Sequence, residues 1–440
     1  MTSSAADVRV PRARLIVAVA AVIGCAAILW LSRTYTFYFD EWTFITTAPD
    51  WTLSSYFEPH NEHPSMLFKA VYAALLNTVG LRTYVPYTAV LLLGHLANVL
   101  LLFELVRRRA GDGIAIAAAA LLLTLGAGWE DLLWAFQMAW LASLACGLGA
   151  LLLLETPPRT PAATALLTAS LAFSGIGVVF AITASAWLLL TPGRRRELLW
   201  LAPVGVGCLA WWAVFGRFGE HPNPQPGLAN LFIDPLYAAW GLGQSVAGLI
   251  GEGGWSGPPL LLAGVAAVAW RLRRHGADPF TVSVAAGLLG FYLVTGLTRA
   301  QLGYQQSGAS RYVYVGAVLW LILLSDAARD LPWRGTWRPA LIALVFVAWF
   351  NCGVLLFSFA AARTVLMQRQ VADYYALAAM RSDPCLDPAG AVDLLVMPVE
   401  TKPAAYYRAV DRYGDPTAGM PLVDRASFEA GMRHLHKAGC

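Results

Sequence analysis

Long apolar runs separated by short polar segments dominate this chain. Each run is near the length of a helix that crosses the hydrocarbon core of a bilayer, or somewhat shorter. The runs lie at residues 15–32, 84–106, 113–128, 133–154, 162–174, 177–190, 198–215, 257–270, 278–297, 312–326 and 339–358. The pattern predicts an all-α polytopic membrane protein with about eleven transmembrane helices.

Arginine clusters between the runs test this topology, because basic residues collect in the cytoplasmic loops of membrane proteins. The first run follows Arg9, Arg12 and Arg14 and lacks a convincing small-residue cleavage site, so it is interpreted as an uncleaved span with a cytoplasmic N-terminus. With this number of crossings the later clusters fall on the same side, and the C-terminus lies outside the cytoplasm. These clusters are Arg107, Arg108 and Arg109; Arg194, Arg195 and Arg196; Arg271, Arg273 and Arg274; and Arg329, Arg334 and Arg338.

Two segments leave the span count open. Residues 162–190 could form one tilted helix, but the sequence FSGIG at 173–177 interrupts them, and two short spans keep the arginine clusters on one side. Residues 231–251 are apolar enough to insert, yet a crossing there would reverse every later assignment. We therefore expect 231–251 to lie on the outer interface or to form a re-entrant segment.

The topology divides the chain into a membrane region, residues 1–360, and a polar extracytoplasmic tail, residues 361–440. The outer loops are residues 33–83, called loop one, and 216–256. Within loop one, SMLFKAVYAALLNTVG at 65–80 has the spacing of an amphipathic helix lying on the outer leaflet. The tail begins as a helix and contains a possible strand at 391–400, which predicts a small α/β unit. Cys385 and Cys440 could pair in this tail, although spacing does not settle it.

Composition supports the membrane assignment and narrows the function classes. The chain is 58% hydrophobic and 13% charged. Its 31 basic residues exceed its 27 acidic residues only slightly and include few lysines, which favours a bacterial source. For a multi-pass bacterial protein we expect an inner-membrane location. No polybasic domain suggests a nucleic-acid partner. The absence of Walker, dinucleotide GxGxxG, CxxC and HExxH motifs disfavours ATP-driven transport, nicotinamide chemistry and zinc proteolysis.

Two carboxylates, Asp40 and Glu41, follow the first span within the aromatic stretch TYTFYFDEWTFI at 34–45. Carboxylates near hydrocarbon are costly, so they are expected to face a wet cavity or to carry a function. The alternative is that they cap the loop and keep the first helix from sliding.

A second polar cluster follows in loop one, in the stretch FEPHNEHPSMLFK. Such side chains could ligate a divalent cation, act as general acid or base, or bind sugar hydroxyls. They could also form a solvated loop, and the neighbouring prolines suggest a shaped loop more than a zinc site. The cluster comprises Glu58, His60, Asn61, Glu62 and His63.

Two further outer stretches carry candidate ligand groups. Residues 298–316 contain Arg299 and Arg311, whose guanidinium groups suit phosphate, although Arg311 could instead snorkel beside Tyr312 in an aromatic belt. Residues 126–140 place acidic and amide side chains beside tryptophans, a pattern found both in sugar sites and in membrane belts.

This arrangement resembles the GT-C class of integral-membrane glycosyltransferases, which includes protein O-mannosyltransferases, aminoarabinose transferases and actinobacterial arabinosyltransferases. The sequence FYFDEW is similar to their acidic motif in loop one. NEHPS and SRYVYVG also look like elements of bacterial multispan relatives. The resemblance covers residues 1–360 by architecture.

The resemblance implies a polyprenyl-phosphate sugar donor and an extracytoplasmic glycan, lipid or protein as acceptor. Asp40 would be the catalytic base in a transfer that inverts the anomeric centre. Glu41 would orient Asp40, bind a cation or hold the loop, so a divalent cation at Asp40 and Glu41 stays open. Arg311 and Arg299 would lie near the phosphate, and the loop-one cluster with Tyr312 would help to bind substrate. The tail is shorter than in the larger relatives, which leaves the acceptor open.

Two other classes compete with this interpretation. A transporter or flippase of a lipid-linked glycan predicts midplane charges and matching broken helices in two repeated halves. The spans carry almost no midplane charge, and no repeat is evident. An envelope-assembly scaffold would use the tail as a docking module.

Overall fold

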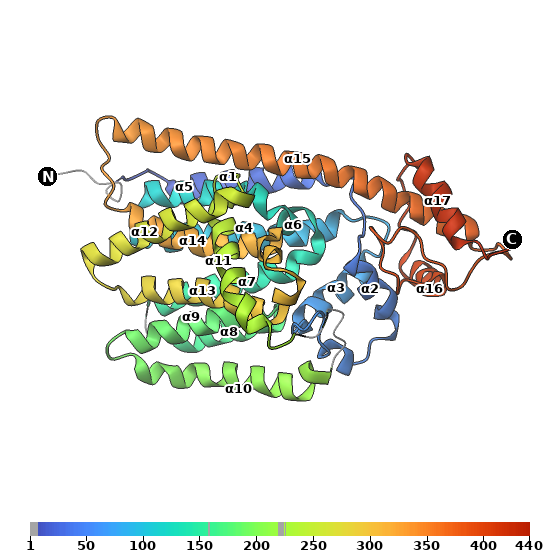
Figure 1. The fold of residues 1–440 in the computed structure, drawn as a ribbon, viewed down its shortest axis with the longest axis horizontal. Coiled ribbons are helices and arrows are strands. Elements are labelled where there is room, and N and C mark those ends of the chain that lie inside the picture. Colours follow the sequence, from blue (N-terminus) through green and yellow to red (C-terminus); the bar gives the residue numbers. More distant parts are fainter. Residues whose placement is uncertain (1–7, 157–158, 219–223, 225) are drawn as a thin grey trace.

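The computed structural model describes residues 8–156, 159–218, 224 and 226–440. Within these ranges all of its secondary-structure elements are helices. Most of the long helices lie side by side in one bundle (Figure 1). The predicted all-α class is therefore confirmed. The predicted cytoplasmic N-terminus lies outside the described residues.

A helix occupies every apolar run that the sequence pattern predicts as a span. These helices are α1 (Ala13–Leu31), α4 (Val85–Ala110), α5 (Asp112–Leu123), α7 (Met138–Leu154), α8 (Thr160–Phe173), α9 (Ile176–Leu190), α10 (Leu198–Val214), α12 (Gly257–His275), α13 (Pro279–Arg299), α14 (Ser310–Ala328) and α15 (Trp337–Met380). Within the described ranges, seven helical segments are long and apolar enough to cross a membrane, or eight if a bent pair is one span. The chain is a multi-pass membrane protein, and the larger span count stays a prediction.

Ion pairs gather the arginine clusters at one end of the bundle. Glu104 on α4 accepts from Arg14 at 3.0 Å and from Arg107 at 2.9 Å. Arg109 pairs with Asp278 at 2.5 Å, which joins the start of α13 to the same end. The helices of loop one and of the tail lie at the other end, on the right in Figure 1. These arginines and the helices of loop one thus lie at opposite ends of the bundle, and which end faces the cytoplasm stays a prediction.

The interrupted segment at 162–190 forms two helices, α8 and α9, as expected. The break falls at Ser174 and Gly175. Past the break, Gly177 lies so close to α8 that an added Cβ would stand 2.4 Å from the Leu171 backbone nitrogen. The glycines of the break therefore let the chain fold back tightly on itself.

Residues 231–251 form α11 (Asn230–Gly248), which packs among α12, α13 and α14. Its small residues allow close approach, since a Cβ on Gly241 would lie 2.3 Å from the Tyr292 ring and one on Gly243 would lie 2.9 Å from Gly257. Tyr237 is fully buried, whereas Phe232 is exposed. One face of α11 thus belongs to the bundle core.

Helix α15 has 44 residues, or a length of about 66 Å, roughly twice the hydrocarbon core. It continues past the predicted end of the last span and forms the base on which the tail packs. The tail helices are α16 (Pro403–Tyr413) and α17 (Arg425–Leu435), and a disulfide joins Cys385 to Cys440.

The strand predicted at 391–400 is wrong, and the tail is helical with turns. The Asp393 carboxylate accepts the Leu395 N–H at 2.9 Å, and the Asp393 carbonyl accepts the Val396 N–H at 3.1 Å. These local bonds close a turn. The Val396 carbonyl instead accepts the Phe39 N–H at 2.8 Å, which ties the tail to loop one.

Loop one folds into α2 (Asp40–Thr47) and α3 (Met66–Thr78), joined by short turns. The predicted amphipathic helix is α3, whose buried face carries Phe68, Tyr72 and Leu76. Lys69 also lies on this buried face. Its ammonium group is satisfied there, because Nζ donates to the Ser55 and Glu58 carbonyls at 2.7 and 2.9 Å. Burial lowers the pKa of Lys69 to about 8.

Candidate functional site

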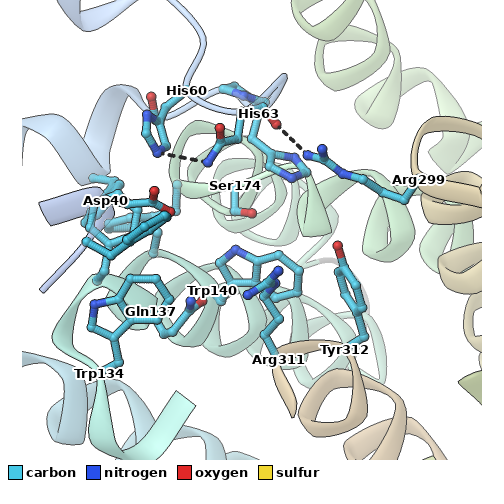
Figure 2. A pocket seen from close by; sticks show the side chains of 18 of the residues that line it. Asp40, His60, His63, Trp134, Gln137, Trp140, Ser174, Arg299, Arg311 and Tyr312 are labelled. Atoms are coloured by element: carbon cyan, nitrogen blue, oxygen red, sulfur yellow. Dashed lines mark hydrogen bonds between the residues drawn. The ribbon is translucent and has the colours of Figure 1, made fainter. Parts of the chain in front are cut away.

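A cavity of about 310 Å³ lies where loop one meets the ends of α7, α13 and α14 (Figure 2). It brings together residues that are far apart in the sequence, and most of the predicted site residues line it. Those that do are Asp40, His60, Asn61, His63, Arg299, Arg311 and Tyr312. Glu41, Glu58 and Glu62 do not line it.

Asp40 is the first residue of α2, and its half-buried carboxyl faces the cavity (Figure 2). Burial raises the pKa of Asp40 to about 6, while nearby Arg311 lowers it and Glu130 and Glu400 raise it. Among the described residues, no side chain or backbone group donates a hydrogen bond to this carboxyl. The preceding residue, Phe39, has a φ of 47°, a strained value for a non-glycine residue. A basic carboxylate is thus held open toward the cavity.

Glu41 points away from the cavity and is fully buried. Its carboxyl accepts the Tyr38 N–H at 2.8 Å and contacts the hydroxyls of Tyr84 and Tyr72 at 3.0 and 3.3 Å. Burial raises the pKa of Glu41 to about 8, against the effect of these hydrogen bonds. Because Asp40 and Glu41 face different surroundings, they do not form a shared cation site.

The histidines of loop one form a two-residue hairpin turn. His60 and His63 exchange both backbone hydrogen bonds at 3.0 Å, while Asn61 and Glu62 at the turn have φ of 48° and 66°. Two positive φ values are typical of the type I′ turn, which asparagine tolerates and glutamate does not favour. The turn projects both imidazoles into the cavity.

Both histidines are held neutral. Burial lowers the pKa of His60 to about 3, helped by Lys69, and lowers the pKa of His63 to about 4, helped by Arg299 and Arg311. The Nε2 atom of His60 lies 3.1 Å from the Asn61 amide nitrogen. In the described part of the chain, no group of three or more histidine, cysteine or acidic side chains is placed to hold a metal ion.

Arg299 fastens this turn to the end of α13. Its guanidinium donates to the Asn61 carbonyl at 3.1 Å and pairs with the Glu62 carboxylate at 2.5 Å. Glu62 therefore reaches the site through Arg299. Glu58 is exposed, and only its backbone carbonyl takes part, as an acceptor for Lys69.

Arg311 is fixed by a reciprocal contact between the starts of α14 and of α6 (Trp129–Leu133). The Glu130 carboxylate accepts the Arg311 backbone N–H at 3.1 Å and its guanidinium at 3.4 Å, while Ser310 Oγ accepts the Glu130 N–H at 3.0 Å. The Arg311 guanidinium lies 5.4 Å from the centroid of the Tyr312 ring. Arg311 is thus oriented at the cavity wall before any ligand binds.

Sequence reasoning missed part of the polar lining. Four buried polar atoms on cavity residues have no hydrogen-bond partner among the described residues: Ser65 Oγ, Trp134 Nε1, Gln137 Oε1 and Ser174 Oγ. Trp134 and Gln137 belong to the tryptophan-rich stretch noted in the sequence, but Ser174 drew attention only as part of a helix break. Buried polar groups normally have partners, so these atoms are available to a polar ligand or water.

A buried arginine, Arg363 on α15, also escaped prediction. Its guanidinium lies 4.0 Å from the centroid of the Tyr38 ring and 5.5 Å from that of Trp134. Arg363 is only 4% exposed and supports the aromatic wall from behind. It does not line the cavity.

The crystal structure of ArnT from Cupriavidus metallidurans bound to undecaprenyl phosphate is similar over 90% of this chain and 84% of that chain. The TM-score is 0.55 and the sequence identity is 13%, so the likeness concerns the fold alone, and it confirms the expected GT-C-like fold. No protein-family model and no curated protein sequence matches the chain.

Proposed function

We propose that this protein transfers a sugar from a polyprenyl-phosphate donor to an acceptor outside the cytoplasm, where the acceptor is a glycan, lipid or protein. The observation that carries the proposal is the cavity of Figure 2, where a half-buried carboxyl and two arginines meet among aromatic rings and unpartnered polar atoms. The similar fold of ArnT, whose crystal structure contains undecaprenyl phosphate, supports a lipid-linked donor.

Asp40 is the proposed catalytic base. It takes the proton of an acceptor hydroxyl while that oxygen bonds to the anomeric carbon and the bond from this carbon to the phosphate oxygen breaks. Polyprenyl phosphate leaves with the electron pair, and the anomeric centre inverts. A pKa of about 6 leaves Asp40 mainly ionised at neutral pH, yet more basic than an ordinary aspartate.

Arg299 and Arg311 are the proposed phosphate ligands. Each is held by one carboxylate, Glu62 or Glu130, and a guanidinium has five N–H donors, so each retains donors for a phosphate. Their positions are fixed before the donor binds, which favours stabilisation of the departing charge.

The sugar is proposed to occupy the space between these groups. Tyr312 and Trp140 offer ring faces, while Gln137 and Ser174 offer hydrogen-bonding atoms. His60 and His63 are neutral and act as hydrogen-bonding groups. Asn61 supplies its amide at the turn, and Glu41 acts as a positioning residue beneath Asp40.

The proposal includes a topology. The cavity end of the bundle faces the outside of a bacterial inner membrane, the N-terminus is cytoplasmic, and the tail is extracytoplasmic. The membrane region, residues 1–360, carries the site, and residues 361–440 cover its outer side.

The test is gene deletion followed by complementation with wild type, Asp40→Asn or Asp50→Asn at matched membrane levels, with envelope glycans profiled by mass spectrometry. Asp50 is a matched control because it is an exposed loop-one carboxylate that pairs with Arg408 at 3.4 Å. We expect a glycan to be lost on deletion and restored by wild type and Asp50→Asn only. Full restoration by Asp40→Asn would overturn the assignment and favour the transporter or scaffold hypothesis.

A further inference from the structure

A second cavity, of about 350 Å³, lies outside the proposed catalytic site. It is bounded by the segment after α1, the segment before α4, the C-terminal half of α15 and the tail. Its lining contains two arginines, Arg33 and Arg82, and no carboxylate. The rest is apolar or neutral and includes Met367, Gln368 and Ala418. The first cavity contains Asp40, whereas this one has only positive charge.

The arginines of this cavity have no acidic partner. Arg33 donates one bond to the Trp30 carbonyl at 2.6 Å and stacks on the Trp30 ring at 3.9 Å, which leaves its other N–H groups open. Neither Arg33 nor Arg82 forms an ion pair within the described residues. Two guanidinium groups beside one cavity without a carboxylate favour an anion.

Hydrogen bonds and close packing hold the segments that line this cavity. The Leu81 N–H donates to the Tyr413 carbonyl at 2.9 Å, and Arg82 packs on Gly414, where an added Cβ would lie 3.1 Å from its side chain. On the opposite wall, the Tyr375 hydroxyl donates to the Met420 carbonyl at 2.9 Å. The backbone next to Arg82 and the tail wall are therefore held in place without a ligand.

The position of the cavity indicates where the anion comes from. Arg33 follows the end of α1, and Arg82 precedes the start of α4, so both lie where two membrane helices leave the bilayer. Trp30, on which Arg33 stacks, is 66% exposed at that helix end, as is typical of a residue in the membrane interface. An apolar wall beside the arginines suits the glycerol and first methylenes of a lipid.

We infer that this second cavity binds the phosphate group of an anionic phospholipid from the leaflet next to loop one. The two guanidiniums take the phosphate oxygens, and the apolar residues of α15 and of the tail contact the adjoining lipid backbone. Tyr84 lines this cavity and contacts Glu41, so the bound lipid would lie behind the start of α2, which carries Asp40. The inference does not depend on glycosyl transfer.

The test uses the purified full-length protein in nanodiscs of phosphatidylcholine with a minor share of phosphatidylglycerol, and native mass spectrometry counts the retained phosphatidylglycerol. We expect wild type to be enriched in phosphatidylglycerol and Arg33→Gln/Arg82→Gln to lose roughly tenfold of this preference. The control is Arg412→Gln/Arg425→Gln, which removes two exposed tail arginines outside the cavity and should behave as wild type.

A second variant distinguishes lipid binding in the cavity from a general effect of positive charge and from a loss of folding. Ala418→Trp fills the cavity from the tail wall and keeps both arginines, so it should also lose phosphatidylglycerol. Equal retention by wild type and both cavity variants would overturn the inference. Binding of inorganic phosphate by wild type, without enrichment of phosphatidylglycerol when phosphate is absent, would show a soluble phosphate site and overturn the lipid assignment.

Discussion

Asp40 lines the cavity through a half-buried carboxyl, whereas its neighbour Glu41 is buried beneath it among tyrosine hydroxyls. Sequence reasoning singled out both because carboxylates are rare beside a span. The resemblance made Asp40 the base but left three roles open for Glu41, because the direction of each side chain depends on how α2 packs against α3 and α4.

The titration of Asp40 gives a pH dependence. A base acts in its ionised form, so with a pKa of about 6 the transfer rate should fall as the pH drops through 6, by about tenfold per unit below it. The rate is measured in isolated membranes with the donor identified from the missing glycan. The assay is run at pH values between about 5 and 8, which lie on either side of this pKa. A transfer rate that stays constant over this range would contradict Asp40 as the base.

Glu41 should govern stability rather than chemistry. Its pKa is raised from the ordinary 4.5 to about 8, so its contribution to stability is fully present below about 4.5 and is lost as the pH rises from there to about 8. Glu41→Gln should fold and should lose much of this pH dependence. Glu41→Ala leaves buried hydroxyls without an acceptor and should cost about 1–3 kcal/mol.

Thermal unfolding in detergent, followed from about pH 4.5 to about pH 8, measures both Glu41 variants. The same loss of stability with rising pH in Glu41→Gln as in wild type would refute this role.

At the scale of elements, apolar periodicity predicted each long helix, because burial in lipid requires a helix to satisfy its own backbone. The break at 173–177 was also predicted, but its contribution to the cavity was not. It lets His63 approach α9 and places Ser174 in the cavity, a contact between segments more than a hundred residues apart.

Gly175 tests this close approach. A Cβ there would lie 2.6 Å from His63 Nδ1, so Gly175→Ala should push the imidazole into the cavity and lower the transfer rate by about tenfold or more, as expected for overpacking. Gly207→Ala is the matched control, because a Cβ on Gly207 meets nothing within 4 Å. Equal rates in the two variants would show that the His63 position is not critical.

At the scale of the whole molecule, α15 connects the bundle to the tail, and the tail reaches loop one through Val396 and Phe39. The sequence located the tail but predicted a strand at 391–400. Strand formation needs a partner strand, and the described part of the tail provides none, so local turns formed around Asp393 instead.

The disulfide between Cys385 and Cys440 closes a long loop in the tail. Reduction should therefore destabilise the tail by about 2–4 kcal/mol, because the unfolded loop regains entropy. The thermal unfolding temperature of the tail is measured with and without reductant. Cys385→Ser/Cys440→Ser should be insensitive to reductant, and the same sensitivity in that variant would assign the effect to other cysteines.

The sequence alone determined the helical membrane architecture, the gathering of arginines between its helices and the position of the acidic motif after the first span. These features follow from local hydrophobicity and charge, which act through the bilayer on each segment separately. Only the tertiary structure decided that Asp40 faces the cavity and Glu41 does not, that Glu62 and Glu130 hold the two arginines, and that Ser174 joins the site. Those roles depend on contacts between distant segments, whose geometry no local pattern encodes.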